Sequence, residues 1–223
     1  MICAGMATVR ERERLFRKAL NSICGQVDNI TVVLNNYDTV PLWLSKMRNV
    51  NCVLSDNHLG DAGKFLHIDQ CNGFYVSVDD DLIYPPNYVP YMVSKYIQHV
   101  GSIITLHGKL FKRPIESSHR GITQSFHCLR PVKGDHIVDT GGTGVMLLNT
   151  NDIKISINDF IVPNMADIWL SKLAKEQGVN IVVVEHNHGW LKYLNPVKTI
   201  WGAHDREKDA YQAKVLSSFL ESV

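Results

Sequence analysis

The chain has 223 residues, of which 45% are hydrophobic and 20% are charged, and its 23 Lys and Arg nearly balance its 22 Asp and Glu. A chain of this size buries roughly 70% of the surface that its unfolded form exposes, which is enough for one globular domain. The net charge of +1 excludes the basic surface of a duplex-DNA or polybasic membrane binder. No apolar run approaches the roughly 20 residues of a membrane span, and no signal peptide precedes the first strand, so we expect a cytoplasmic protein.

The cysteines are odd in number, widely spaced and free of any C-x-x-C pair. This pattern predicts reduced, structural thiols better than disulfides or zinc ligands. They are Cys3, Cys24, Cys52, Cys71 and Cys128.

Short apolar runs alternate with helical patterns along the first hundred residues, which is typical of β-α-β units and a mainly parallel sheet. We expect strands over residues 2–7, 30–34, 52–54 and 73–78. A capping box at Thr8-Val9-Arg10-Glu11 opens the first expected helix, and Gly25 ends it. A second helix begins at Pro85-Pro86, and a strand over 102–106 follows it.

The pattern loosens in the second half of the chain. Residues 107–140 are rich in His, Arg, Gly and Pro and are expected to form long loops, which often carry function. A small-residue turn at 141–144 then leads into a strand over 145–148. A helix over about 164–177 and a strand over 181–184 are expected to complete the regular structure.

Three adjacent carboxylates, Asp79, Asp80 and Asp81, follow the strand expected at 73–78. Ligands of open α/β sheets bind outside the carboxyl ends of the strands, so these residues are expected in the functional crevice. The three charges repel one another without a cation, and oxygen ligands of this kind suit Mg²⁺ or Mn²⁺. The alternative is a solvated acidic turn, but the buried strand before it favours a metal site.

A second group of polar residues lies at the ends of the earlier strands. Their spacing matches neither a P-loop nor a dinucleotide-binding fingerprint. Amide and carboxylate groups can read a pyrimidine and a ribose, and basic groups can bind phosphates, so the group suits a nucleoside diphosphate. Each residue alone would be a cap, a turn residue or a solvated charge. The group comprises Thr8, Arg12, Asn35, Asn36, Asp56, Asn57, Asp61 and Lys64.

Weaker signals lie near the C-terminus. Asp167 falls in the first turn of an expected helix, where a carboxylate is favourable by roughly 0.3–1 kcal/mol without any function. His186, His188 and His204 are candidate metal ligands, and the first two face the same side of an extended segment. Trp201 is expected in the core.

The segment 78–89, VDDDLIYPPNYV, resembles the D-x-D region of GT-A glycosyltransferases. It is most similar to the bacterial capsule enzymes that add α-linked N-acetylglucosamine during heparosan synthesis, and more distantly similar to exostosin-like retaining transferases. The resemblance covers about three quarters of the chain. The other similar stretches are 6–30, 34–35, 56–65, 129–131 and 142–144.

This resemblance implies a single GT-A (Rossmann-like) α/β domain over 1–223, with a mainly parallel central sheet flanked by helices. The donor-binding half would span about 1–106 and the acceptor half about 107–223. Asp79 and Asp81 would hold the metal, and Asp167 resembles the acidic residue at the reacting centre. The implied donor contacts are Thr8, Arg12, Asn35, Asp56, Lys64, Asp79 and Asp80. The alternatives for a third metal ligand are His188, His204 or no further residue. The candidates for the basic group that assists the leaving phosphate are Lys192, Lys198 and Arg206.

Together these features predict a glycosyltransferase, dependent on Mn²⁺ or Mg²⁺, that moves a hexose or N-acetylhexosamine from a UDP-sugar to an oligosaccharide or polysaccharide. The resemblance implies retention of configuration and a role in capsule or other surface glycan synthesis. One alternative is a catalytically silent module that binds a glycan or nucleotide sugar. Another is an inverting transferase with Asp167 as general base. A sugar nucleotidyltransferase fits less well, because residues 6–10 lack a glycine-rich basic loop. The chain is also compatible with one catalytic domain of a larger glycan-assembly protein.

Overall fold

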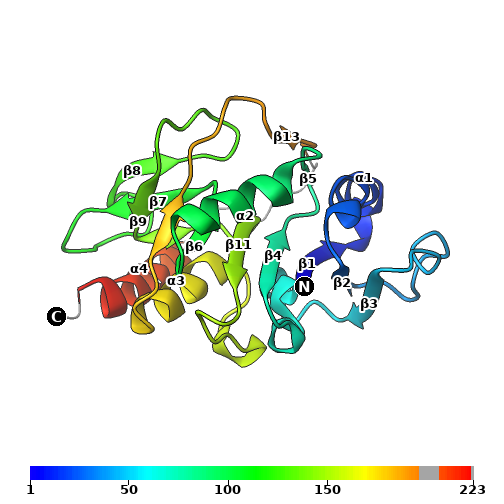
Figure 1. Cartoon of the computed structure of the whole chain (residues 1–223). Helices are drawn as coiled ribbons and strands as arrows, with labels where there is room; N and C mark the ends of the chain where they lie inside the picture. Colours follow the sequence, from blue (N-terminus) through cyan, green and yellow to red (C-terminus); the bar gives the residue numbers. More distant parts are fainter. Residues whose placement is uncertain (196–205, 222–223) are drawn as a thin grey trace.

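The computed structural model describes residues 1–195 and 206–221. Its centre is an eight-stranded mixed sheet (Figure 1). In spatial order the strands are β3 (Val50–Ser55), β2 (Asn29–Asn35), β1 (Ile2–Val9), β4 (Phe74–Val78), β11 (Val145–Asn149), β6 (Ile103–Thr105), β12 (Ile181–Val183) and β9 (His136–Val138). Strands β3, β2, β1 and β4 run parallel to one another, as do β6 and β12, whereas β11 is antiparallel to both of its neighbours. The expected α/β class with a mainly parallel central sheet is confirmed.

Two apolar cores, one on each face of this sheet, hold four helices in place. Helices α1 (Glu13–Ile23) and α2 (Tyr88–Gln98) pack in one core, and α3 (Ala166–Glu176) and α4 (Arg206–Leu220) pack in the other. Strand side chains alternate between the cores: Leu147 of β11 joins the first, and Met146 and Leu148 join the second. Helix α1 buries Phe16 and Leu20 on one stripe, as its apolar spacing predicts.

The expected capping box at Thr8 is wrong. Thr8 is the seventh residue of strand β1, and the segment Arg10–Arg12 that follows has no side-chain cap. The Thr8 hydroxyl instead donates to Asp80, at 2.8 Å. A tertiary partner 72 residues away has therefore replaced the local capping bond that the sequence pattern favours.

Residues 107–140 are not the long loops expected from their composition. They contain β7 (Gly108–Phe111), β8 (Ile122–Phe126) and β9, and β10 (Thr140–Gly141) begins at their end. Strands β10, β7 and β8 form a separate antiparallel sheet. The centre of β8 is exposed and the pairing with β7 contains a register shift, so neither strand shows a clear period-two pattern.

Regular structure also continues beyond residue 184, contrary to expectation. A two-stranded ribbon joins β5 (Leu82–Ile83) to β13 (Lys192–Tyr193). Helix α4 packs against α3 (Figure 1) and buries Ala213, Leu216 and Phe219 at helical spacing. Trp201 lies outside the described residues. Within residues 1–195 and 206–221, no helix combines the length and apolar character needed to cross a membrane.

Candidate active site

A cleft of about 890 Å³ opens at the carboxyl ends of β1, β2 and β4. Residues of β7, α3 and α4 also line it. It brings together most of the residues singled out from the sequence, although they lie up to 159 positions apart. These are Thr8, Arg12, Asn35, Asn57, Asp61, Lys64, Asp79, Asp80, Asp81 and Asp167. Asp56 does not line the cleft, and its exposed carboxylate interacts with His58.

The three consecutive carboxylates have three different environments. Asp80 is only 4% exposed, and both of its oxygens are engaged: Oδ2 accepts from the Thr8 hydroxyl and Oδ1 from Arg12, each at 2.8 Å. Burial raises the pKa of the Asp80 carboxyl, while Arg12 and Thr8 oppose that shift. The Asp80 carboxylate therefore holds Thr8 of β1 and the Arg12 guanidinium in place beside the cleft.

Asp79 forms an ion pair with the buried ammonium of Lys64. Burial alone would lower the pKa of Lys64, but Asp79 and Asp61 outweigh that effect and raise it, so Lys64 stays charged. Lys64 sits on the 3₁₀ segment Gly60–Phe65, whose backbone lies directly on β1. A Cβ on Gly5 would come within 1.8 Å of the Lys64 carbonyl oxygen, so the absence of a side chain there permits this close approach.

Asp81 is the carboxylate best suited to a cation. Burial, Asp79 and Asp80 raise its pKa to about 7, and the nearest cationic group is the Arg12 guanidinium at 3.6 Å. A divalent cation between Asp79 and Asp81 would relieve this excess of negative charge, and carboxylate oxygens are the ligands that Mg²⁺ and Mn²⁺ prefer. The residues present therefore fit such a metal.

Tyr84 and Gly144 complete the support of Asp79, a role that no pattern in the sequence predicts for either residue. The Asp79 amide donates to the Tyr84 hydroxyl at 2.8 Å, and that hydroxyl donates to the Gly144 carbonyl at 2.6 Å. A Cβ on Gly144 would lie 1.8 Å from Asp79 Oδ2. Tyr84 thus links the carboxyl end of β4 to the turn before β11, and only glycine leaves room for the Asp79 carboxylate there.

Asp167 lies in the first turn of α3 and lines the cleft. Its Oδ1 accepts from the Thr143 amide at 2.8 Å and from the Thr143 hydroxyl at 2.7 Å. Among the described residues, Asp167 Oδ2 has no hydrogen-bond partner in the structure. The cap of the same helix comes from elsewhere, because the Ala166 amide donates to Asp61 at 3.1 Å. Asp167 is therefore held firmly by one oxygen and presents a carboxylate to the cleft.

Two polar atoms in the cleft walls are buried and lack a partner in the described part of the chain: Asn35 Oδ1 and Asp61 Oδ1. An unpaired buried acceptor is costly unless a ligand or water satisfies it. Burial raises the pKa of Asp61 to about 6, although Lys64 opposes the shift. Both atoms mark positions where the cleft can accept hydrogen bonds from a bound molecule.

The candidate metal-ligand histidines His186 and His188 lie in different environments. His186 is buried, and its ring nitrogens face the carbonyls of Val184 at 2.7 Å and His127 at 3.4 Å. His188 is exposed and does not line the cleft. Lys192 is also exposed and away from the cleft, whereas its neighbour Tyr193 lines it. His204 and Lys198 lie outside the described residues, as does the side chain of Arg206.

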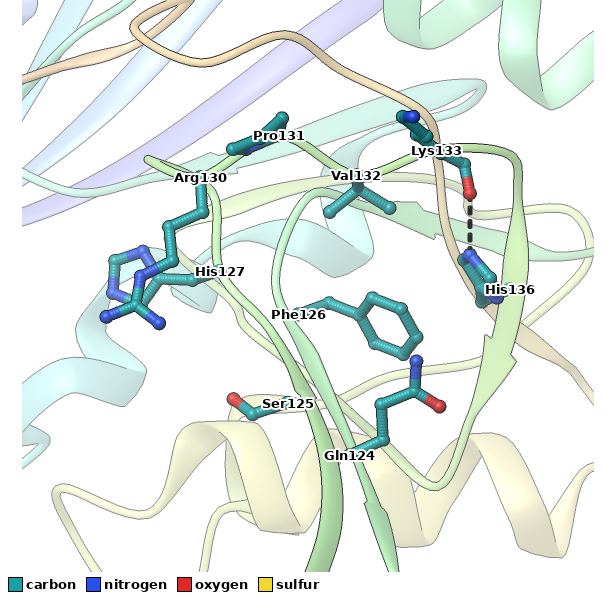
Figure 2. Close-up of a pocket in the computed structure, with 9 residues that line it drawn as sticks. All are labelled: Gln124, Ser125, Phe126, His127, Arg130, Pro131, Val132, Lys133 and His136. Atoms are coloured by element: carbon teal, nitrogen blue, oxygen red, sulfur yellow. Dashed lines mark hydrogen bonds between the residues drawn. The ribbon is translucent and has the colours of Figure 1, made fainter.

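A second, smaller cavity of about 390 Å³ adjoins the cleft and shares His127 with it. Figure 2 shows its lining, in which Arg130 extends beside His127 and Phe126 lies near His136. Every ionisable side chain of this lining is basic: His127, Arg130, Lys133 and His136. The cavity was not singled out from the sequence, because its residues come from β8, from β9 and from the segment between them.

The architecture is the GT-A glycosyltransferase fold. S. aureus TarS 1-349 has a similar fold: its complex with UDP-GlcNAc matches with a TM-score of 0.64 and 13% sequence identity, over 100% of this chain and 66% of the TarS chain. Its complex with UDP matches with a TM-score of 0.56 and 15% identity, over 84% and 58%. This chain thus spans less than two thirds of the length of either TarS chain. No protein-family model and no curated protein sequence matches it.

Proposed function

We propose that this protein is a metal-dependent glycosyltransferase that uses a UDP-sugar and a glycan acceptor. One observation carries the proposal: a single cleft at the carboxyl ends of the parallel strands holds the Asp79 and Asp81 carboxylates, two cationic side chains and the Asp167 carboxylate. Two neighbouring carboxylates that can hold a metal, with a further carboxylate in the same cleft, suit a substrate that has both a diphosphate and a reacting sugar. The likeness to TarS, solved with UDP and UDP-GlcNAc, supports the choice of donor class.

In this proposal the donor lies over the ends of β1, β2 and β4. Asp79 and Asp81 would hold Mn²⁺ or Mg²⁺, which would supply positive charge for the leaving diphosphate. Arg12 adds positive charge beside the same carboxylates. The unpaired Asn35 Oδ1 accepts a hydrogen bond from the nucleoside, and Asp80 acts by holding Arg12 and Thr8 rather than by touching the donor.

Asp167 acts on the sugar side of the cleft. Thr143 holds its Oδ1, which leaves Oδ2 to receive a proton from the acceptor hydroxyl or to stabilise positive charge on the sugar. The resemblance to the heparosan enzymes favours retention of configuration and transfer of an N-acetylhexosamine for a surface glycan. An inverting reaction would make Asp167 the general base. Proton NMR of the freshly formed product decides between the two, and we expect a retained anomeric configuration.

The acceptor would approach over the segment 107–144, several of whose residues line the cleft. The smaller cavity in Figure 2 continues this surface through His127. A glycan longer than one sugar therefore has room to extend from the reacting centre along β8. This placement assigns the donor to the first half of the chain and the acceptor to the second.

A screen of UDP-sugars for UDP release, with and without Mn²⁺ and in the presence of glycan acceptors, tests the proposal. We expect release with at least one donor, dependent on both metal and acceptor, and strongly reduced in Asp81→Asn. A catalytically silent binding module would bind UDP-sugars or glycans and release no UDP under any of these conditions.

A further inference from the structure

We propose that His107, His127 and Cys128 form a second metal site, for Zn²⁺ or a similar transition metal, in the wall of the cleft. One ligand atom from each of these residues lies within 4.8 Å of the other two. The two imidazole rings are 4.9 Å apart between centroids. Nitrogen and sulfur are the ligands that Zn²⁺ prefers, with bond lengths near 2.0–2.3 Å, so modest side-chain movement closes the three atoms around one ion.

The backbone already fixes the two loops that carry these residues. His107 lies between β6 and β7, and its carbonyl accepts from the Gly142 amide at 2.7 Å. His127 and Cys128 follow β8 directly, and the His127 carbonyl accepts from the Arg130 amide at 2.8 Å within a tight turn. The ligand positions therefore come from ordered segments on two sides of the site, which lowers the cost of assembling it.

The protonation states suit a metal at the histidines and require a proton to leave the cysteine. Burial lowers the pKa of His107 to about 4, and burial together with Arg130 lowers that of His127, so both rings keep a free lone pair at neutral pH. Burial, reinforced by Asp79, raises the pKa of Cys128 to about 12. Metal binding would therefore release the thiol proton.

One existing interaction must change when the metal binds. The Leu129 amide donates to His127 Nδ1 at 3.2 Å. Coordination through Nδ1 replaces that hydrogen bond directly, and coordination through Nε2 moves the ring proton to Nδ1 and removes it as well. All three ligand residues line the cleft, so a fourth coordination position remains open toward bound substrate or water.

This site differs in chemistry from the carboxylates of Asp79 and Asp81. Oxygen ligands favour Mg²⁺ and Mn²⁺, whereas two imidazoles and a thiolate favour Zn²⁺ and Co²⁺. The site also revises the expectation that all five cysteines are purely structural, because Cys128 is the cysteine that the fold brings next to two histidines. The inference is independent of sugar transfer and is tested by metal binding alone.

Titration of the reduced, metal-free protein with Co²⁺ tests the proposal by absorption spectroscopy. We expect one equivalent of Co²⁺ to bind with a thiolate-to-cobalt charge-transfer band, and Zn²⁺ to displace it. Cys128→Ser should lose the band, and His107→Gln and His127→Gln should each weaken Co²⁺ binding by at least about tenfold. Cys24→Ser, a partly buried thiol elsewhere, should keep the band.

Asp81→Asn should also keep the thiolate-to-cobalt band, since Asp81 is not one of the three proposed ligands. Absence of the thiolate band in the wild-type protein would overturn the proposal. So would a band that survives in a folded Cys128→Ser protein or disappears in a folded Asp81→Asn protein. If Cys128→Ser does not fold, as judged by its melting curve, an unweakened Co²⁺ affinity in both histidine variants overturns the proposal instead.

Discussion

Replacing Asp167 by asparagine removes a charge from the cleft while keeping the shape of the side chain. Asparagine Oδ1 can still accept from the Thr143 amide and hydroxyl, the two bonds of 2.8 and 2.7 Å that hold the carboxylate. The substitution then removes only the negative charge, which strengthens these hydrogen bonds and is favourable at a helix N-terminus. We expect its removal to lower the unfolding free energy by about 1 kcal/mol. For a chain of this size, that lowers the melting temperature by about 2–4 °C.

The expected effect of Asp167→Asn on turnover is much larger. If the carboxylate takes the acceptor proton or stabilises the reacting sugar, its loss should reduce transfer by about 100-fold or more, equivalent to about 2.7 kcal/mol in activation free energy. The UDP affinity should stay within about twofold of wild type, because the proposal assigns the diphosphate to the metal held by Asp79 and Asp81 and not to Asp167.

A transfer assay at saturating acceptor, together with a melting curve and a UDP titration, measures these effects separately. Asp159→Asn is a matched control, because this carboxylate also lies at a helix start and accepts from the Ser156 amide at 2.7 Å, but does not line the cleft. The control should lose a similar amount of stability and no turnover. Wild-type transfer by a folded, UDP-binding Asp167→Asn protein would refute the catalytic role and leave Asp167 as a structural residue of α3.

Two further substitutions test the support of Asp79. Gly144→Ala places a Cβ 1.8 Å from Asp79 Oδ2. We expect it to weaken Mn²⁺-dependent UDP binding, measured by calorimetry, by about tenfold or more. Gly25→Ala is the control, because its Cβ meets no atom within 4 Å, and it should leave UDP binding unchanged. Tyr84→Phe leaves the Asp79 amide and the Gly144 carbonyl without their shared partner and should cost about 2–4 kcal/mol of unfolding free energy in denaturant titration. Tyr88→Phe is its control, because that neighbouring buried hydroxyl has no partner among the described residues, and equal losses in the two variants would contradict the hydrogen-bond argument.

The sequence predicted where the cleft lies because its walls depend on local patterns. Short apolar runs identified β1, β2 and β4, and the carboxyl ends of parallel strands converge at one edge of a sheet. Thr8, Asn35 and Asp79 were therefore expected together and do line one cleft. The position of Asp167 followed from the helix pattern that begins beside it.

What each carboxylate does could not be predicted, because it depends on partners far away in the chain. The sequence alone does not distinguish Asp79, Asp80 and Asp81. In the folded chain, the Asp80 carboxylate accepts hydrogen bonds from Thr8 and Arg12, which are 72 and 68 residues away. Similarly, Asp56 and Asp61 were expected in one group, but the chain turns at Asn57, whose φ is 71°. Asp56 is left in solvent, while Asp61 reaches the cleft.

The sequence did not predict the strands β7 to β10 beside the cleft, for a different reason. Strands β7 to β10 are short, the centre of β8 is exposed and the pairing of β7 with β8 is irregular in register, so the segment resembles a loop in the sequence. The meeting of His107 with His127 depends on the pairing of β7 with β8, which no local pattern encodes. The sequence does contain a pattern that indicates helix α4, since the apolar residues Ala213, Leu216 and Phe219 repeat at helical spacing.

The central claim is that Asp79 and Asp81 hold a divalent cation on which the diphosphate of a UDP-sugar binds. Titration of the protein with UDP by calorimetry, once with Mn²⁺ and once with EDTA, tests it most directly. We predict binding that weakens by at least about tenfold when the metal is removed, and an Asp81→Asn protein whose UDP affinity no longer responds to Mn²⁺. Equal UDP affinity of the wild-type protein in the two conditions would contradict the account.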